Sequence, residues 1–149
     1  MAFVWSVLIA VASMVSAQAV DVPNGWRMKE FMISVWGGPH DEATARAFAE
    51  AGFNTVMGPL NTLELCRRHG LKLMAMDAKP DDARRLQRDE AVWGWFVRDE
   101  PPPETWPDIA KSVAAFHEAD PFHPAYVNLV CSWDADKFCE MVKPRFLSY

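Results

Sequence analysis

The feature that most constrains the fold is a regular alternation of short apolar runs with helix-like stretches from residue 31 onward. The runs have the length of buried strands and are bounded by Gly, Pro, Asn or Asp. Predicted strands lie at 31–36, 53–57, 71–77, 92–99, 125–130 and 146–149. Strands that alternate with helices form parallel sheets with right-handed crossovers. The chain is therefore predicted to be an α/β protein.

The intervening stretches carry helix start and stop signals. Asp41 is expected to cap a helix that Gly52 ends, and Pro80 opens a charged helix. The fourth predicted helix starts at Pro103, and a helical period near 3.6 predicts that it buries Trp106, Ile109, Ala110, Val113 and Ala114. The helix that ends at Gly70 begins with capping-box-like residues, Asn61 and Glu64. The last helix is marked by apolar residues at helical spacing: Ala135, Phe138, Cys139 and Val142.

Two folds are compatible with this alternation: a doubly wound sheet and a (β/α)8 barrel. No Gly-rich phosphate-binding motif follows the first predicted strand, which argues against the nucleotide-binding doubly wound folds. A complete barrel typically has about 250 residues, whereas this chain has 149. We therefore predict an incomplete (β/α)8 TIM barrel of about six β-α units over residues 20–149. Open sheet edges and an exposed apolar interior would make it depend on a missing C-terminal half or on self-association.

The N-terminal segment has the features of a signal peptide. Residues 1–20 carry no charged side chain, and Phe3–Val15 is apolar. The pattern Ala17-Gln18-Ala19 suits cleavage after Ala19. A signal peptide at 1–19 implies a secreted or periplasmic protein with no stable membrane span after cleavage. An uncleaved anchor is the competing interpretation, but the serines and the glutamine make a poor spanning helix.

Composition and spacing exclude several functions. The formal net charge is −5, which argues against nucleic acid as a partner. The four His and three Cys show none of the usual metal-ligand spacings, so neither a metal nor another cofactor is predicted. Three Cys cannot all pair even in an oxidising compartment, so they are interpreted as small buried hydrophobic residues.

The end of the fourth predicted strand, Trp95-Phe96-Val97-Arg98-Asp99-Glu100-Pro101, carries most of the functional information. Strand alternation places Gly94, Phe96, Arg98 and Glu100 on one face and Trp93, Trp95, Val97 and Asp99 on the other. If both Trp pack under the helices, Glu100 faces the barrel mouth, where barrel active sites lie. A carboxylate among aromatic residues can hold a raised pKa and donate a proton. A structural alternative is a carboxylate that faces the dipole of the next helix.

The stretch Gly94-Trp95-Phe96-Val97-Arg98-Asp99-Glu100-Pro101 resembles the acid/base strand of clan A glycoside hydrolases, which are (β/α)8 barrels, and is closest to family 42-like or cellulase-like members. In that clan the acid/base Glu follows the fourth strand, usually within Asn-Glu-Pro. Glu100 and Pro101 match this pattern, whereas Asp99 replaces the usual Asn. The Asn donates to a sugar hydroxyl, but an ionised Asp can only accept.

This resemblance implies retaining hydrolysis of O-glycosyl bonds in oligo- or polysaccharides, with Glu100 as general acid/base. The clan's nucleophile is a Glu after the seventh strand, beyond the six strands predicted here, so the isolated chain is expected to be inactive. One alternative is a non-catalytic carbohydrate-binding or assembly-dependent barrel fragment. Another is a barrel lyase or isomerase that uses Glu100 as a base.

Further residues occupy positions where carbohydrate contacts are expected. Aromatic faces stack on sugar rings, and short polar side chains bind hydroxyls. The predicted substrate-binding residues are Asp99, Trp36, His40, Asp77, Asn128 and Trp133. Four of them also have a structural interpretation: Trp36 as core or rim, His40 as a loop residue, Asp77 as a cap of the helix near Pro80, and Trp133 as packing at the start of the last helix.

Overall fold

The computed structural model describes residues 26–148, so the predicted signal peptide at 1–19 lies outside the described residues. The strands are β1 (Ser34–Trp36), β2 (Thr55–Gly58), β3 (Lys72–Ala75), β4 (Val92–Asp99), β5 (Ala125–Asn128) and β6 (Phe146–Ser148). The α-helices are α1 (Glu42–Glu50), α2 (Leu63–Arg68), α3 (Pro80–Leu86), α4 (Trp106–Ala119) and α5 (Ala135–Val142). Short 3-10 helices, η2 (Leu60–Thr62) and η3 (Pro103–Thr105), precede α2 and α4.

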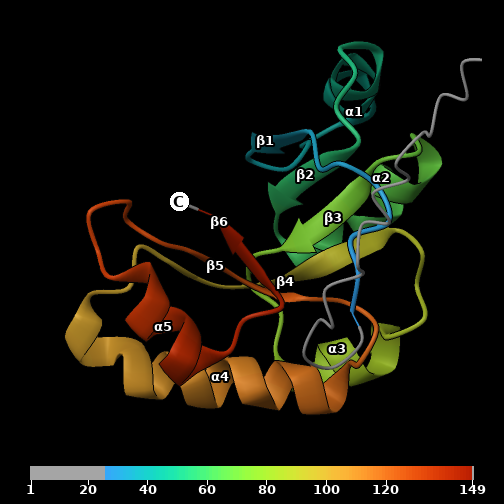
Figure 1. Ribbon diagram of the computed structural model, residues 1–149. Coiled ribbons are helices and arrows are strands. Elements are labelled where there is room, and N and C mark those ends of the chain that lie inside the picture. Colours follow the sequence, from blue (N-terminus) through green and yellow to red (C-terminus); the bar gives the residue numbers. More distant parts are fainter. Residues whose placement is uncertain (1–25, 149) are drawn as a thin grey trace, which may run out of the picture.

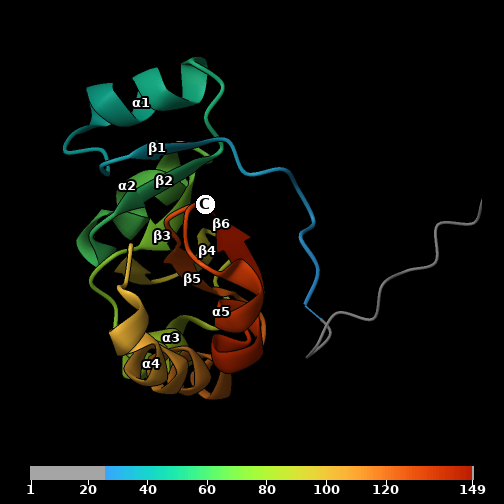
Figure 2. The same cartoon turned by 60° about the vertical axis from the view of Figure 1, so that its left-hand side comes forward.

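The six strands form one parallel sheet in the order β1-β2-β3-β4-β5-β6. Because every crossover of a parallel sheet is right-handed, a sequential strand order puts all helices on the same face. Figures 1 and 2 show the sheet curling, with the helices on its outer side. A doubly wound sheet would reverse its strand order and carry helices on both faces. The predicted α/β class is confirmed, and the curled half-barrel sheet is compatible with an incomplete barrel.

Apolar side chains are buried on both faces of the sheet. The larger core lies between sheet and helices and contains Trp95, Trp106 and Phe138. On the concave face, a second cluster consists of Met57, Met74, Trp93 and Tyr126, with Trp26, Met32, Phe96 and Phe146 packed against it. The expectation of an exposed apolar interior is therefore wrong for these four central side chains, because neighbouring aromatic residues and the segment before β1 cover them.

Helix boundaries follow the predicted signals, but the buried faces differ in part. The Asp41 carboxylate caps α1 by accepting from the Thr44 N–H at 2.7 Å, as expected. In α4, Trp106, Ile109 and Val113 are buried as predicted, whereas Ala114 is exposed and Phe116 and Ala119 are buried instead. Large side chains reach the sheet more readily than Ala, so they set the rotation of the helix.

The start of α2 differs from the predicted capping box. No side chain caps this helix, which η2 extends at its N-terminal end. The Leu60 N–H instead donates to Asp77 Oδ1 at 2.6 Å, from the loop after β3. A long-range contact therefore replaces the expected local one.

Strand β4 is irregular, and this changes which side chains share a face. Its pairing shifts register against β3 near Leu73 and Met74, and against β5 between Phe96 and Arg98. Consequently Trp93 lies in the concave cluster and Trp95 in the helix-side core. The prediction that both Trp share one face of the sheet is wrong, because a β-bulge interrupts the strict alternation of side chains.

Residues 26–148 contain no helix suited to span a membrane and no cluster of metal ligands. No helix in that range has the length and apolar character needed to cross a membrane. No cluster of three or more His, Cys, Asp or Glu suited to a metal ion occurs there. Cys66 is buried as expected, but Cys131 and Cys139 are exposed, and all three are free thiols.

Candidate functional site

A row of polar side chains crosses the carboxyl ends of β4, β5 and β6. Ser148 Oγ donates to Asn128 Oδ1 at 3.1 Å, and Asn128 Nδ2 donates to Asp99 Oδ1 at 3.0 Å. The strand pairing sets Asp99 beside Asn128 and Asn128 beside Ser148. The row lies on the concave face, because Asn128 is two residues beyond Tyr126 along β5. The bulge thus turns Asp99 to the concave face, although alternation predicted that it faced the helices.

Tyr126 precedes Asn128 by two residues on β5 and belongs to the concave cluster. Burial raises the pKa of the Tyr126 hydroxyl; a hydrogen bond with Ser148 lowers that pKa, and the Asp99 charge raises it further. A phenol with a raised pKa stays protonated at neutral pH and can serve as a hydrogen-bond donor.

Aromatic residues line the part of the concave face toward β1. Trp36 ends β1 and remains 53% exposed. Its ring packs edge-on against Phe96 of β4, with centroids 5.7 Å apart. The Phe96 ring in turn packs against the Tyr126 ring, with centroids 5.5 Å apart. The concave face therefore combines an exposed aromatic surface with a row of amide, hydroxyl and carboxylate groups, a combination typical of sites for small polar organic ligands.

Glu100 follows β4 in a backbone conformation that non-glycine residues rarely adopt, with φ of 43°. Its N–H donates to the Asn128 carbonyl at 2.9 Å, and Pro101, Pro102 and Pro103 follow. The residue is exposed, and no ion pair joins it to Arg98 in the part of the chain that the structure describes. Glu100 is thus held at the same edge of the sheet as the polar row.

Three other predicted residues make structural contacts. Asp77 accepts from Leu60 rather than capping the helix near Pro80. His40 Nε2 lies 3.2 Å from Thr44 Oγ1 at the start of α1. Trp133 packs edge-on against Trp106, with centroids 6.4 Å apart, as part of the helix-side core. The structure therefore brings Asp99, Asn128 and Glu100 together but places Trp133 on the other face of the sheet.

Sequence reasoning missed Tyr126 and Ser148 because each sits in a strand that reads as ordinary core or chain end. Tyr126 lies two residues before Asn128 on β5, and strand pairing brings Ser148 beside Asn128. Sequence reasoning also missed a buried polar network at the opposite end of the sheet. There Asp120 Oδ2 accepts from Trp95 Nε1 at 2.8 Å and from His123 Nδ1 at 2.7 Å.

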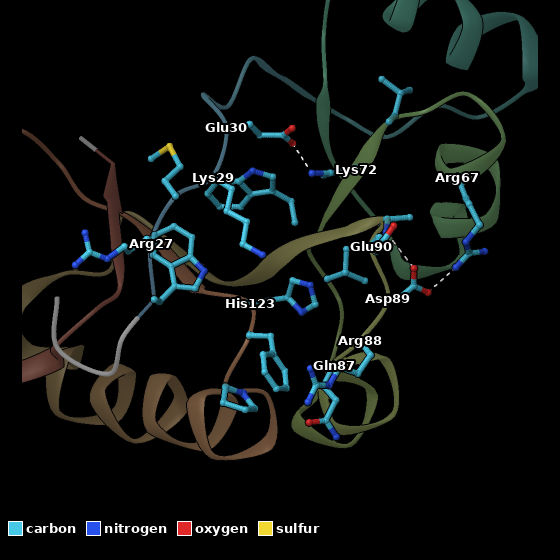
Figure 3. Close-up of a pocket in the computed structure, with 18 of the residues that line it drawn as sticks. Arg27, Lys29, Glu30, Arg67, Lys72, Gln87, Arg88, Asp89, Glu90 and His123 are labelled. Carbon is cyan, nitrogen blue, oxygen red and sulfur yellow. Dashed lines mark hydrogen bonds and ion pairs between the residues drawn. The ribbon is translucent and has the colours of Figure 1, made fainter. Parts of the chain in front are cut away.

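A cavity lies at the amino ends of β3, β4 and β5, far from Glu100 along the strands. Figure 3 shows its charged lining, which includes Lys29, Arg88 and His123. In barrel enzymes the chemistry lies at the carboxyl ends of the strands, and the amino ends serve stability. The candidate site is therefore the group of residues around Asp99, Glu100 and Asn128 rather than this cavity.

The fold and the position of the site define a parallel half-barrel whose candidate ligand-binding edge is at the carboxyl ends of its strands. A solved structure with a similar fold is a glycosyl hydrolase family 2 (GH2) member from Bacteroides cellulosilyticus DSM 14838. The two superpose with a TM-score of 0.55 at 16% sequence identity, over 78% of this chain and 20% of that one. No family model and no curated protein matches the chain. At this identity the likeness shows a glycoside hydrolase-like fold alone.

Proposed function

We propose that this chain is part of a glycoside hydrolase-like catalytic domain that binds oligo- or polysaccharide, with Glu100 as its general acid/base. The main supporting observation is the placement of Glu100 beside the Asp99–Asn128–Ser148 row, at the carboxyl edge of a parallel half-barrel. The distant structural likeness to a glycosyl hydrolase is consistent with this proposal.

The proposed chemistry assigns proton transfer to Glu100. The protonated carboxyl donates to the glycosidic oxygen as the leaving group departs, and the resulting carboxylate then deprotonates the attacking water. Retaining hydrolysis needs a second carboxylate about 5–5.5 Å away as nucleophile. The clan resemblance expects that group after a seventh strand, whereas the described sheet has six. We therefore expect the 149-residue chain to bind glycans without hydrolysing them.

Asp99 and Trp36 are proposed to orient the sugar. Asp99 Oδ1 already accepts from Asn128, so Oδ2 is the oxygen that would accept from a sugar hydroxyl. The exposed ring of Trp36 offers a flat apolar surface to the C–H face of a pyranose. Asp99 in place of the clan's usual Asn means that this position accepts from the sugar and cannot donate to it.

Glycan binding is the direct test. The chain would be titrated with a panel of neutral oligosaccharides by calorimetry, alongside Trp36→Ala and Asp99→Ala variants. We expect each variant to bind about fivefold or more weakly, because stacking or a charged hydrogen bond is lost. Met141→Ala, a half-exposed position on α5, is the matched control and should bind like the unmodified chain. Equal affinity in all variants, or no binding to any glycan, would contradict the proposal.

Hydrolysis is tested separately from binding. A version of the protein that supplies further strands, if it turns over a glycan, should lose turnover in Glu100→Gln while keeping its affinity. The second candidate function is a non-catalytic, carbohydrate-binding or assembly-dependent fragment. It is favoured by the outer edges of β1 and β6, which have no partner strand among residues 26–148. Glycan binding without turnover in that longer version would favour this second candidate, whereas turnover that Glu100→Gln does not change would contradict the proposed role of Glu100.

We also propose that the protein is exported and that residues 1–19 are removed. N-terminal sequencing of protein recovered from the periplasm or the medium should begin at Val20. Recovery of the intact N-terminus in a membrane fraction would favour the anchor interpretation instead.

A further inference from the structure

The cavity at the amino ends of the strands has a volume of about 850 Å³. One wall is the segment 26–30 before β1. The other wall is formed by the turns that lead into β3, β4 and β5. Trp93 forms part of the lining and is itself 93% buried, with 7% of its surface exposed. The cavity has the size range of small-molecule sites and lies at the end of the sheet opposite Glu100.

Basic side chains outnumber acidic ones around this cavity, although the whole chain has a net charge of −5. The basic lining residues are Arg27, Lys29, Arg67, Lys72 and Arg88, and the acidic ones are Glu30, Asp89 and Glu90. Two of the acids already have basic partners. Glu30 pairs with Lys72 at 2.6 Å, and Asp89 pairs with Arg67. The third, Glu90, is exposed and makes no ion pair among the described residues.

Lys29 and Arg88 carry charge that no carboxylate in the described range neutralises. They come from opposite walls, and Figure 3 shows the Lys29 side chain extending into the cavity. The Arg88 guanidinium stacks 3.7 Å from the centroid of the Phe122 ring. Stacking orients the guanidinium and leaves its N–H edge available to a carboxylate or phosphate.

The lining of this cavity also contains aromatic side chains. Trp26 packs edge-on against Trp93, with centroids 6.1 Å apart, and both line the cavity. His123 also lines it, and its Nδ1 is held by the buried Asp120 at 2.7 Å, which fixes the ring. The arrangement offers an apolar surface for the body of a ligand and two basic groups for its charge.

We propose that this cavity binds a small organic anion whose carboxylate or phosphate lies between Lys29 and Arg88 and whose apolar part contacts Trp26 and Trp93. The site is separate from the proposed glycan site, and it does not depend on Glu100. Binding here requires no covalent step and no metal ion.

A matched pair of probes tests the proposal on the full chain by calorimetry. Phenylacetate and phenylacetamide share an apolar body, but only the first carries a charge. We expect phenylacetate to bind at least about fivefold more tightly than the amide, and Lys29→Gln and Arg88→Gln to remove most of that difference. Phenyl phosphate in a parallel titration distinguishes the two anion classes, and the tighter ligand identifies the preferred one.

The control variant is Arg84→Gln on α3, because Arg84 pairs with Asp81 and does not line the cavity. It should bind phenylacetate like the unmodified chain, and so should Glu100→Gln. All variants change exposed side chains, and thermal unfolding would confirm that each is folded. Equal affinity for acid and amide, equal losses in Arg84→Gln and Arg88→Gln, or no binding at millimolar ligand would overturn the proposal.

Discussion

At the scale of single residues, Asp120 depends most on its hydrogen-bond partners, because its carboxylate is fully buried. Burial acts to raise its pKa, but hydrogen bonds from His123 and the Phe122 N–H outweigh burial and leave the pKa lowered. Each oxygen accepts two N–H donors: Oδ2 from Trp95 and His123, and Oδ1 from the Phe122 and His123 backbone. The ionised side chain therefore joins β4 to the turn before β5.

We expect Asp120→Asn to lower the free energy of unfolding by about 2–4 kcal/mol. Whichever oxygen becomes NH2 faces N–H donors and leaves them without an acceptor. Urea denaturation would measure the loss. Asp108→Asn on α4, whose exposed side chain pairs with Lys111, is the control and should change stability by less than about 1 kcal/mol. Similar losses in the two variants would show that Asp120 has no special role.

His117 predicts a dependence of stability on pH. Burial and the nearby Arg145 charge lower the pKa of His117 from 6.5 to about 4, and Asp120 only partly opposes them. Between these values the unfolded chain binds a proton that the folded chain does not bind. The free energy of unfolding should therefore fall as pH decreases from 6.5 toward 4.

Denaturation at several pH values between 6.5 and 5 would measure this slope. His117→Gln removes the titrating group and keeps an acceptor for the Ala125 N–H, so its slope should be smaller over the same range. Parallel slopes in the two proteins would rule out His117 as the source.

At the scale of elements, β4 determines the geometry of both ends of the sheet. It is the longest strand, with eight residues, and it is irregular against both neighbours. These irregularities put Trp93 on the concave face and Trp95 against α4, and they turn Asp99 toward Asn128. Gly94 lies between the two Trp, where a Cβ would come within 2.7 Å of the Pro124 carbonyl oxygen.

Gly94→Ala is expected to destabilise the fold by about 1–3 kcal/mol. The added methyl group would overlap the carbonyl oxygen of Pro124, in the segment that leads into β5. Thermal or urea unfolding would measure the effect. Gly52→Ala is an informative comparison: a Cβ at Gly52 has open space, but its φ of +88° strains any side chain. If Gly94→Ala were as stable as the unmodified chain, β4 and Pro124 would not be in close contact.

At the scale of the whole molecule, the sheet is curled but not closed among residues 26–148. The outer edges of β1 and β6 have no partner strand in that range. Large apolar side chains are exposed beside β1, with Phe31 at 79% and Ile33 at 47%. Unpaired edges with exposed apolar residues favour association with another chain.

We therefore expect the purified chain to associate with increasing concentration, as measured by sedimentation velocity. Phe31→Lys together with Ile33→Lys should reduce association, because charge beside an edge strand opposes pairing. Met141→Lys removes an apolar side chain of similar exposure on α5, away from β1, and should leave association unchanged. A chain that stays monomeric at all concentrations would contradict this expectation.

Much of the architecture could be predicted from local patterns. The strand at 92–99, the Asp41 cap and the start of the last helix at Ala135 agree with the structure. The first strand is shorter than predicted, because Asn54 binds the Phe31 carbonyl and the Ile33 N–H through its side chain. Such long-range contacts leave no local pattern in the sequence.

The order and type of the elements, the parallel α/β class and the polar end of β4 were determined by the sequence itself. These depend on periodicity, capping and turn residues, which act over a few neighbouring positions. Only the tertiary structure decided that Asp99 shares a face with Asn128, that Trp133 joins the helix-side core and that Asp120 is buried. These outcomes depend on strand register and on contacts between distant segments, where a single bulge reverses the direction of every side chain beyond it.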